Sequence, residues 1–557
     1  MKKQIVAFLG IILLLASCAD KKNDANVKQE PTTVKIPFDW NAANLYFLLT
    51  DRFNNGDTTN DVNFSRTEKT GKYRGFEGGD LKGITQKIRE GYFTKLGVNA
   101  IWMTPIVEQI KGGTDEGNGF TYAYHGYWTK DWTQLDPNFG TIADLKELIK
   151  VAHENDIRVL LDAVVNHTGP VTEKDEVWEN TWVRTSPQCM YKDYESTIRC
   201  TLVKNLPDVL TEKNTDVELP KQLVEKWKSE GRYEQEVAEL DEFFKKTGYP
   251  RAPRFYIMKW LADYIAEFGI DGYRVDTVKH TEENVWQEFR KICDEAYNQF
   301  KQKHPKQYLS ENFYLVGEVY GYGIGGKQLY DFGDKKVNYF DKAFNSLINF
   351  EFKWNAKQVP NYEATFSRYD SILHTDLKGY GVLNYLSSHD DGEPFDAQRA
   401  KPYEMATKLL LTPGTAQIYY GDETARPLEI DGAEGDANLR SPMNWEDVAK
   451  EETKKILAHW QKLGKFRKKH PSVGAGKHTM LSETPYIFKR EYSKENYQDK
   501  VIVGLDLPVG NKTIQVAETF NNSEELYDAY SNQKIKVIDG NVSFSSPFTI
   551  VLLEKYK

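Results

Sequence analysis

The sequence lacks the features that would place most of it in a membrane or on a nucleic acid. The apolar run at its start, Ile5 to Leu15, is shorter than the about 20 residues with which a helix crosses a bilayer. No long basic stripe appears among the 73 basic and 82 acidic residues, whose formal net charge is −9, so we expect no nucleic-acid partner. Repeats and long low-complexity tracts are absent too. What remains is a chain of 557 residues, long enough for a large core and too long for one compact domain.

Cysteine is scarce, with four residues in the chain. Cys18 ends the run Leu15-Ala-Ser-Cys18, which resembles a bacterial lipoprotein cleavage box and follows Lys2-Lys3 and the apolar run. The resemblance implies a signal peptide over 1–17, lipid on Cys18 and a polar, flexible tether over 18–37. More than one acyl chain anchors a protein stably, so we expect this chain at the bacterial cell envelope, attached to a membrane by its lipid. The alternative is a plain secretory signal that is cleaved nearby.

The most informative segment is Gly269–His280, which reads GIDGYRVDTVKH. Arg274 lies two residues before Asp276 at the polar end of a short apolar run, and side chains two apart on a strand point to the same face. A neighbouring guanidinium lowers the pKa of an aspartate, so Asp276 would stay ionised in a crowded site, as a carboxylate nucleophile must. Taken alone, the pair fits an ordinary ion pair at a strand end equally well.

The same pattern recurs in three other segments, which place reactive groups directly after an apolar, strand-like run. They are Val159–His167, Tyr314–Glu318 and Val382–Asp390. Amphipathic stretches lie between them, such as Thr141–Glu154, in which Thr141 is the expected N-cap. Alternating strands and helices predict a parallel sheet, and a (β/α)8 barrel brings the carboxyl ends of its strands together where catalysis takes place. Four strand ends that carry Asp, Glu, His and Arg therefore indicate an enzyme.

These segments resemble the conserved regions of glycoside hydrolase family 13, the α-amylase family. The four regions correspond, in order, to Asp162–His167, Gly269–His280, Gly317-Glu318 and His389-Asp390. Leu206-Pro-Asp208 resembles the family's extra motif in the loop after the third strand. Order and spacing agree from about Leu45 to the C-terminus, and Tyr122–Trp132 and Trp460–His478 are most similar to the periplasmic α-amylases. One position departs from the pattern, because the fourth region usually reads Asn-His-Asp and Ser388 replaces the Asn here.

The resemblance implies a (β/α)8 TIM barrel with an inserted domain B after the third strand and a C-terminal antiparallel β-sandwich. We expect the barrel over 38–167 and 255–470, domain B over 168–254 and the sandwich over 471–557. The expected barrel strands are Leu45–Thr50, Ala100–Thr104, Arg158–Val165, Gly272–Val275, Tyr314–Gly317, Lys342–Phe344, Val382–Leu386 and Ala416–Tyr419. Alternating runs such as Lys500–Leu505 predict the strands of the sandwich.

Three carboxylates are the expected catalytic residues. Cleavage of a glycosidic bond needs a proton donor and a carboxylate on opposite sides of the sugar. By resemblance, Asp276 is the nucleophile that forms a covalent glycosyl-enzyme, Glu318 is the acid/base, and Asp390 stabilises the oxocarbenium-like transition state. Burial beside another carboxylate can raise the pKa of Glu318 for this role. A retaining pair of carboxyl groups lies about 5–5.5 Å apart, and we expect α-linked substrates to give α-products.

Other residues of the motifs are expected to bind the sugar. The set comprises Tyr127, which would stack on a sugar ring, His167 and His389, which would hydrogen-bond its hydroxyls, Arg274, and Lys279 and His280, which would reach the leaving-group side. Taken singly, a histidine or a tyrosine is more often structural. Their places within the motifs, in the right order, favour the functional interpretation.

A calcium ion is expected as well. The resemblance implies that the side chains of Asn166 and Asp208 and the backbone carbonyl of His280 bind it between the barrel and domain B, and calcium takes such hard oxygen ligands. The alternative is that Asn166 and Asp208 simply hydrogen-bond the backbone. A zinc site is suggested by four histidines of these motifs, His125, His167, His280 and His389. None of them has the close spacing of common zinc sites, and catalysis by paired carboxylates needs no metal.

The remaining cysteines differ in their expected state. Cys189 and Cys200 lie close together in the inserted region, and an envelope location permits disulfides. They are therefore the pair in which we expect a bridge, and two free thiols are the alternative. Cys293 falls in the helical run Trp286–Phe300 and is expected to be a buried free thiol.

The sequence thus predicts an α-amylase that hydrolyses internal α-1,4 bonds of starch or maltodextrin, with an α-glucan as its binding partner. A maltogenic hydrolase, an α-glucosidase or a transglycosylase of the same family is the first alternative, because the motifs do not reveal how well the acceptor subsites exclude water. A non-catalytic glycan-binding protein on the same scaffold is the second. Binding alone gives no reason to retain Asp276, Glu318 and Asp390 together.

Overall fold

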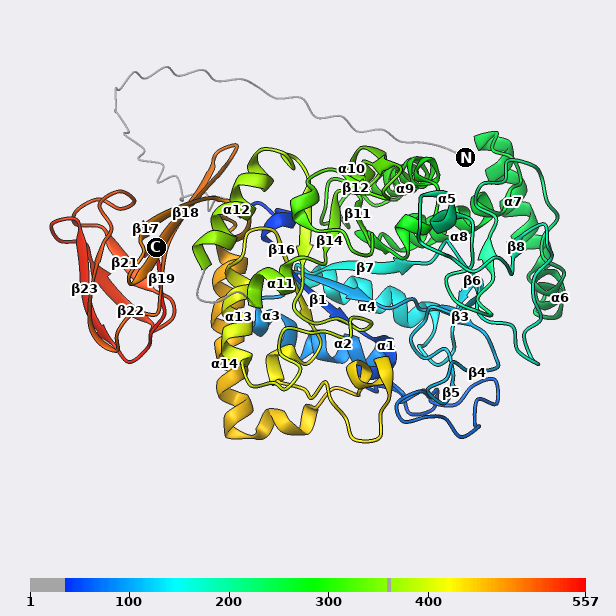
Figure 1. Ribbon diagram of the computed structural model, residues 1–557, viewed down its shortest axis with the longest axis horizontal. Coiled ribbons are helices and arrows are strands. Elements are labelled where there is room, and N and C mark those ends of the chain that lie inside the picture. Colours follow the sequence, from blue (N-terminus) through cyan, green and yellow to red (C-terminus); the bar gives the residue numbers. More distant parts are fainter. Residues whose placement is uncertain (1–35, 358–361, 557) are drawn as a thin grey trace, which may run out of the picture. The chain divides into compact units, whose positions relative to one another are not determined.

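The computed structural model describes residues 36–357 and 362–556 (Figure 1). The predicted signal peptide over 1–17, the lipid attachment at Cys18 and most of the tether lie outside the described residues. Among the helices that the structure describes, none combines the length and the apolar character that crossing a membrane would require.

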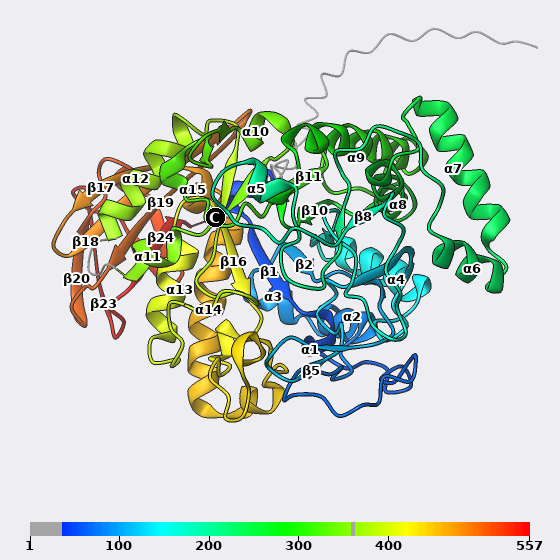
Figure 2. The ribbon, with the colours of Figure 1, turned by 45° about the vertical axis from the view of Figure 1, so that its right-hand side comes forward.

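Parallel strands close into a barrel, with helices around it (Figures 1 and 2). In the order in which they pair around the barrel, the strands are β1 (Asn44–Leu48), β16 (Thr415–Tyr419), β15 (Gly381–Asn384), β14 (Ser346–Asn349), β11 (Tyr314–Gly317), β10 (Gly272–Val275), β7 (Arg158–Ala163) and β2 (Ala100–Met103). Every one of their residues is buried, because the helices cover the outside of the sheet and side chains fill its inside. The predicted (β/α)8 barrel is confirmed.

The prediction of the sixth barrel strand was wrong. The sequence placed it at Lys342–Phe344, whereas the strand in the structure is β14, Ser346–Asn349. Residues Tyr339–Lys342 instead form the helical turn α10, whose N-cap is Asn338. The Asn338 side chain accepts a hydrogen bond of 3.1 Å from the backbone N–H of Asp341, and such a cap stabilises a helix start.

The helices that pack around the barrel include amphipathic segments with clear start signals. Those of five or more residues outside the inserted segment are α2 (Leu81–Arg89), α3 (Tyr92–Leu96), α4 (Ile142–Glu154), α8 (Pro253–Phe268), α9 (Glu283–Lys303), α11 (Phe352–Lys357), α12 (Tyr362–His374), α13 (Pro402–Leu411) and α14 (Glu451–Lys469), and shorter ones are α1 (Thr50–Phe53) and α15 (Ser472–Ala475). In α4 the predicted N-cap is present. Thr141 and Asp144 form a reciprocal capping box, in which each side chain accepts from the other's backbone N–H.

Two segments extend from the barrel after β2 and β7. After β2, strand β3 (Val107–Gln109) pairs with β6 (Thr129–Leu135), and β4 (Thr114–Asp115) pairs with β5 (Phe120–Thr121). After β7, the segment that we expected as domain B carries β8 (Val183–Arg184), α5 (Glu195–Ile198), β9 (Asp208–Val209), α6 (Lys221–Ser229) and α7 (Tyr233–Thr247). Helices α6 and α7 bury few of their residues and are otherwise charged, as a solvated face requires.

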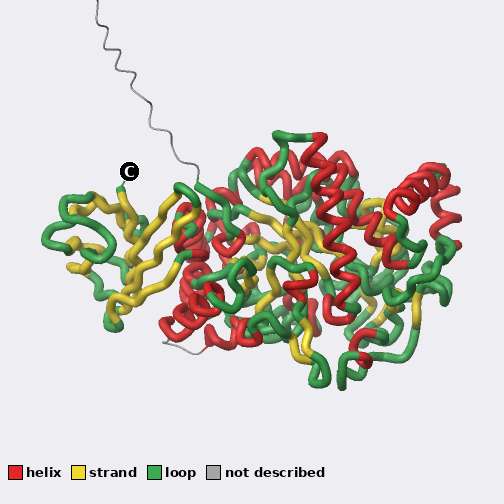
Figure 3. Tube along the Cα trace, turned by 90° about the horizontal axis from the view of Figure 1, so that it is seen from above, coloured by secondary structure: helices red, strands yellow, loops and turns green. Residues whose placement is uncertain are grey.

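The C-terminal residues form antiparallel sheets, drawn as yellow strands in Figure 3. One sheet has the order β17 (Lys477–Ser482), β18 (Tyr486–Lys494), β19 (Tyr497–Leu505), β24 (Val551–Lys555), β21 (Glu525–Asp528) and β22 (Gln533–Lys536), and another pairs β20 (Gly510–Gln515) with β23 (Asn541–Ser546). A separate short hairpin of β12 (Tyr330–Asp331) and β13 (Lys336–Val337) lies between β11 and β14 in the sequence. The C-terminal strands enclose an apolar core of their own. Arg490 ties them to the barrel by donating to the Leu411 carbonyl at 2.7 Å.

Candidate active site

The predicted catalytic residues gather at the carboxyl ends of neighbouring barrel strands. Asp276 follows the last residue of β10, and Glu318 follows the last residue of β11. These two strands pair in register, Val275 opposite Gly317. Asp390 lies in the loop after β15. Closure of the barrel therefore brings together side chains that are far apart in the sequence.

Arg274 contacts three carboxylates of the site. Its Nη1 lies 2.7 Å from Asp276 Oδ1 and 3.0 Å from Asp162 Oδ1, and its Nη2 lies 3.0 Å from Glu318 Oε2. The Arg274 side chain is 1% exposed. One buried cation thus contacts three carboxylates, so the charges are paired but the carboxylates outnumber the cation. The planar guanidinium also fixes the mutual orientation of the acids.

Glu318 has the properties of a proton donor. Burial raises its pKa well above the ordinary value, and the nearby negative charges of Asp276 and Asp390 add to this against the opposing effect of Arg274. Its Oε2 accepts a 2.9 Å hydrogen bond from the backbone N–H of Thr277, which fixes the side chain. A carboxyl group with a raised pKa retains its proton near neutral pH and can give it to a leaving oxygen.

Asp162 occupies a central place that the sequence did not assign to it. Its Oδ2 accepts hydrogen bonds from Tyr127 Oη at 2.9 Å and from Trp102 Nε1 at 3.0 Å, in addition to the contact with Arg274. Burial raises the pKa of Asp162 to about 7. The residue stood inside a recognised motif, but its partner Trp102 comes from β2, and only the register of β2, β7 and β10 reveals that they meet.

The predicted sugar-binding histidines are buried and close to the carboxylates. His167 Nε2 donates to the Tyr127 carbonyl at 3.1 Å, and its Nδ1 is buried without a hydrogen-bond partner. The His389 ring is stacked on Tyr127, with centroids 5.3 Å apart. Burial lowers the pKa of both histidines, so they are neutral and can each donate and accept hydrogen bonds.

Lys279 and His280 follow Asp276 in the sequence, and each donates a hydrogen bond to a backbone carbonyl. Lys279 Nζ donates to the Tyr320 carbonyl at 3.0 Å, and burial lowers its pKa. His280 Nδ1 donates to the Thr197 carbonyl at 3.0 Å, and burial lowers the pKa of His280 to about 4. His280 therefore contacts the inserted segment that contains α5, and Lys279 contacts the loop after β11.

The loop after β15 is held by contacts that the motif alone did not predict. Ser388, which replaces the usual Asn, lies 3.4 Å from Asp390 Oδ1 through its Oγ. Arg440 donates to the His389 carbonyl at 2.8 Å. The Asp390 side chain is 41% exposed and is therefore accessible to a substrate. Arg440 lies 50 residues further along the chain, so no local pattern links it to this loop.

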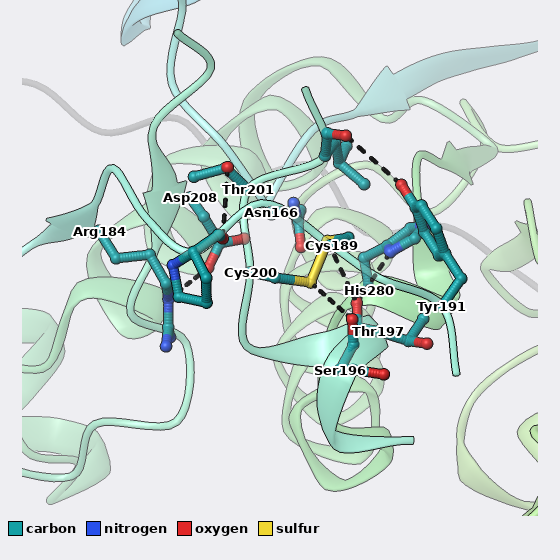
Figure 4. The surroundings of a disulfide bond; sticks show 12 residues. Asn166, Arg184, Cys189, Tyr191, Ser196, Thr197, Cys200, Thr201, Asp208 and His280 are labelled. Atoms are coloured by element: carbon teal, nitrogen blue, oxygen red, sulfur yellow. Dashed lines mark hydrogen bonds and ion pairs between the residues drawn. A yellow bond between two sulfur atoms is a disulfide. The ribbon is translucent and has the colours of Figure 1, made fainter. Parts of the chain in front are cut away.

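The three residues predicted to bind calcium lie close to one another (Figure 4). Asp208 Oδ2 forms an ion pair with Arg184 Nε at 2.7 Å, whereas its Oδ1 is buried without a hydrogen-bond partner. Asn166 Oδ1 accepts from Thr281 Oγ1 at 3.2 Å. An orphaned carboxylate oxygen next to an amide oxygen is a donor set that suits a hard cation. No group of three or more His, Cys, Asp or Glu side chains among the described residues is arranged to hold a metal.

Cys189 and Cys200 are joined by a disulfide in the inserted segment, and Cys293 is a buried free thiol (Figure 4). The bridge closes a loop that includes α5. This loop is the one whose Thr197 carbonyl receives the hydrogen bond from His280, so the disulfide closes a loop that contacts the candidate site.

A barrel whose strand ends gather two aspartates and a glutamate with a raised pKa around one buried arginine is the arrangement of a glycoside hydrolase. The family model described as "Alpha amylase, catalytic domain" matches residues 47–450. The periplasmic α-amylase of Escherichia coli (strain K12) is 34% identical over 551 residues, which cover 88% of this chain and 76% of that protein. The chain belongs to the α-amylase family, glycoside hydrolase family 13.

More distant relatives agree with this assignment. The cyclomaltodextrin glucanotransferase of Paenibacillus macerans is 26% identical, over 83% of this chain and 59% of that protein. Among solved structures, an Anoxybacillus α-amylase matches with a TM-score of 0.62 at 24% identity, covering 94% of this chain and 100% of that one. The latter similarity concerns the fold.

Proposed function

We propose that this glycoside hydrolase is an α-amylase that cleaves internal α-1,4 bonds of starch or maltodextrins with retention of configuration. The observation that carries the proposal is the contact of Arg274 with both Asp276 and Glu318, at 2.7 and 3.0 Å. The two acids that the proposed mechanism needs therefore share one arginine, and the pKa of Glu318 is raised well above its ordinary value. The periplasmic α-amylase that is 34% identical supports the choice of substrate.

The reaction would proceed in two displacements. In the first, Asp276 attacks the anomeric carbon while Glu318 protonates the leaving glycosidic oxygen, so the C–O bond breaks and a glycosyl ester forms. In the second, the ionised Glu318 removes a proton from water, which attacks the same carbon and releases Asp276. Asp390 would stabilise the positive charge that develops on the sugar in both steps.

The residues around the carboxylates would position the sugar. Tyr127 offers its ring for stacking while its hydroxyl is engaged by Asp162. The unpartnered Nδ1 of His167 is available to accept a hydrogen bond from a sugar hydroxyl, and neutral His389, whose ring is stacked on Tyr127, would do the same. Lys279 and His280 would serve the leaving-group side.

Calcium would be bound by Asn166, Asp208 and the His280 carbonyl. The buried and unpartnered Asp208 Oδ1 supports this, because a buried carboxylate oxygen without a partner is costly. The ion would link the barrel to the inserted segment.

Removal of calcium with EGTA is expected to lower Tm, and calcium alone among Mg²⁺, Zn²⁺ and Ca²⁺ should restore it. An Asp208→Asn variant should have the lower Tm already and not respond to EGTA, and a wild-type Tm that EGTA leaves unchanged would contradict the site.

The chain would act at the cell envelope, attached to a membrane by lipid on Cys18. The relative named periplasmic supports the compartment. Palmitate labelling of the expressing cells is expected to mark the wild-type protein and not a Cys18→Ala variant. Equal labelling, or none in either, would leave a plain secretory signal as the better explanation.

A transglycosylating or maltogenic enzyme is the competing function, since a cyclomaltodextrin glucanotransferase is among the relatives. The product-length profile on soluble starch separates the two, with Asp276→Asn as the inactive control. A rapid fall in chain length with a spread of oligosaccharides supports the α-amylase. Early maltose with persisting long chains, or cyclic products, would support the competitor.

A further inference from the structure

Asp391, the residue after the proposed transition-state stabiliser Asp390, is fixed through both of its carboxylate oxygens. Its Oδ2 accepts hydrogen bonds from Tyr385 Oη and from Lys353 Nζ, each at 2.6 Å. Its Oδ1 accepts a hydrogen bond from the Glu393 backbone N–H at 3.2 Å. The loop after β15 is therefore fastened directly beside Asp390.

Lys353 reaches this loop from a different part of the barrel. It belongs to α11, which follows β14, and β14 pairs with β15. The Lys353 side chain is 7% exposed and that of Asp391 is 11% exposed. Burial alone would raise the pKa of Asp391, but its hydrogen bonds to Lys353 and Tyr385 outweigh this and lower the pKa. The two residues therefore form a desolvated ion pair, in which loss of one partner leaves the other charge unbalanced.

The charge of Asp391 acts on Asp390. Burial raises the pKa of Asp390, Arg274 and Arg440 oppose this rise, and the negative charge of Asp391 adds to it. The other titratable groups near Asp390 are Glu318, His389, Tyr127, Tyr320 and Tyr385. A carboxylate that has to be ionised in order to stabilise positive charge thus lies beside a second carboxylate, and Lys353 is the cation that pairs with this second one.

We propose that Lys353 is a positioning residue for the hydrolytic reaction and acts on Asp390 through Asp391. The ion pair fixes the loop that carries Asp390 and balances the negative charge next to it. This proposal rests on the proposed function. It differs from a purely structural role of the pair, because it makes the ionisation of Asp390 depend on a lysine of α11.

The test is the pH profile of kcat/KM for maltoheptaose. In Lys353→Met the charge of Asp391 is unbalanced, so kcat/KM should fall about 10–100-fold and the acidic limb should move up by about 0.5–1 pH unit. Lys353→Arg retains the charge and should restore most of the activity. Asp391→Asn removes the charge that raises the pKa of Asp390, so its acidic limb should move to lower pH.

The double variant Lys353→Met/Asp391→Asn removes both charges together. Its acidic limb should return close to that of the wild type, and its kcat/KM should exceed that of Lys353→Met, because the effects of paired residues are not additive. Lys357→Met is the matched control and should leave the profile unchanged. Lys357 is an exposed residue of the same helix, and its Nζ lies 4.4 Å from the Trp354 ring centroid, against 4.8 Å for Lys353.

An acidic limb that stays in place in Lys353→Met would overturn the proposal, and so would a double variant that is no more active than Lys353→Met. Circular dichroism checks folding. If Lys353→Met does not fold, the double variant is compared with Asp391→Asn, and identical acidic limbs in these two would overturn the proposal as well. A wild-type enzyme that does not turn over maltoheptaose would instead overturn the proposed function, and this inference with it.

Discussion

Arg274 is the residue on which the chemistry of the site depends. It is fully buried, and it contacts the proposed nucleophile Asp276, the proposed proton donor Glu318 and a third carboxylate, that of Asp162. A lysine could not replace it, because a single ammonium group cannot present two separated N–H groups to two acids in a fixed plane. Burial raises the pKa of Glu318, and Arg274 opposes this rise.

Replacing Glu318 by Gln tests the proton donor. The pKa of Glu318 is raised by burial, so wild-type kcat/KM should decline on the alkaline side as this group loses its proton. In Glu318→Gln, kcat should fall about 10²–10⁴-fold, the usual share of general acid–base catalysis, while isothermal titration still detects maltoheptaose binding. Glu491→Gln, at an exposed glutamate of β18, is the control. Undiminished turnover in Glu318→Gln would refute the assignment.

Asp162 is predicted to be a positioning residue. In Asp162→Asn the pKa of Glu318 should fall, because a neighbouring negative charge is lost and Arg274 has one partner fewer. The alkaline limb of the pH profile should move to lower pH, and kcat/KM should drop by up to about 100-fold through misplacement of the reacting groups.

Tyr127→Phe provides the matched comparison for Asp162→Asn. It removes one hydrogen bond to Asp162 Oδ2 but leaves the charge and the ring. For Tyr127→Phe we expect a smaller loss of kcat/KM than for Asp162→Asn, without a shift of the pH profile. If both variants shift the profile equally, the charge of Asp162 is not the cause.

At the scale of elements, the sequence predicted the strands that carry motifs and missed one that does not. β10 and β11 were placed at their observed bounds, because each is an apolar run that ends at a functional carboxylate. β14 has no such residue at its end, and the predicted strand fell just before it, overlapping the end of the helical turn α10. Asp162 and Arg440 were missed as site residues, since their partners come from other strands and loops and are defined only after the barrel closes.

Helix α4 offers a test of the local signals. Thr141→Ala removes the side chain that accepts from the Asp144 N–H, and the loss of such a cap is expected to cost about 1 kcal/mol of unfolding free energy. Urea denaturation followed by circular dichroism measures it. Thr58→Ala, at an exposed loop position, should change stability little. A cost no larger than that of Thr58→Ala would mean that packing alone sets the start of α4.

At the scale of the whole molecule, the barrel and the C-terminal sheet meet at a buried charged cluster. His470, after α14, contacts Asp499 at 2.7 Å through Nδ1 and Glu554 through Nε2. Burial alone would lower the pKa of His470, but its hydrogen bonds to the two carboxylates outweigh this and raise the pKa. The stabilisation that His470 gains from the two carboxylates is therefore fully present below the unfolded-state pKa of about 6.5. It is lost as pH rises through the folded-state pKa of His470.

His470→Gln is expected to destabilise the protein by about 3–5 kcal/mol at pH 6, because two buried carboxylates lose their shared cation. The difference in Tm from the wild type should shrink at alkaline pH, where His470 is neutral in both states. Thermal unfolding at several pH values measures this, with His304→Gln as the control. A difference in Tm that does not change with pH would show that His470 acts by packing rather than by charge.

The central claim, a retaining mechanism through Asp276 and Glu318, is tested most directly by the configuration of the first products. Proton NMR of maltoheptaose hydrolysis, recorded before mutarotation, distinguishes the anomers of the newly formed reducing ends. The account predicts α-anomers in excess at early times, relaxing later to the equilibrium mixture. An initial excess of β-anomers would contradict it, since it would mean that water attacks directly and that Asp276 forms no glycosyl ester.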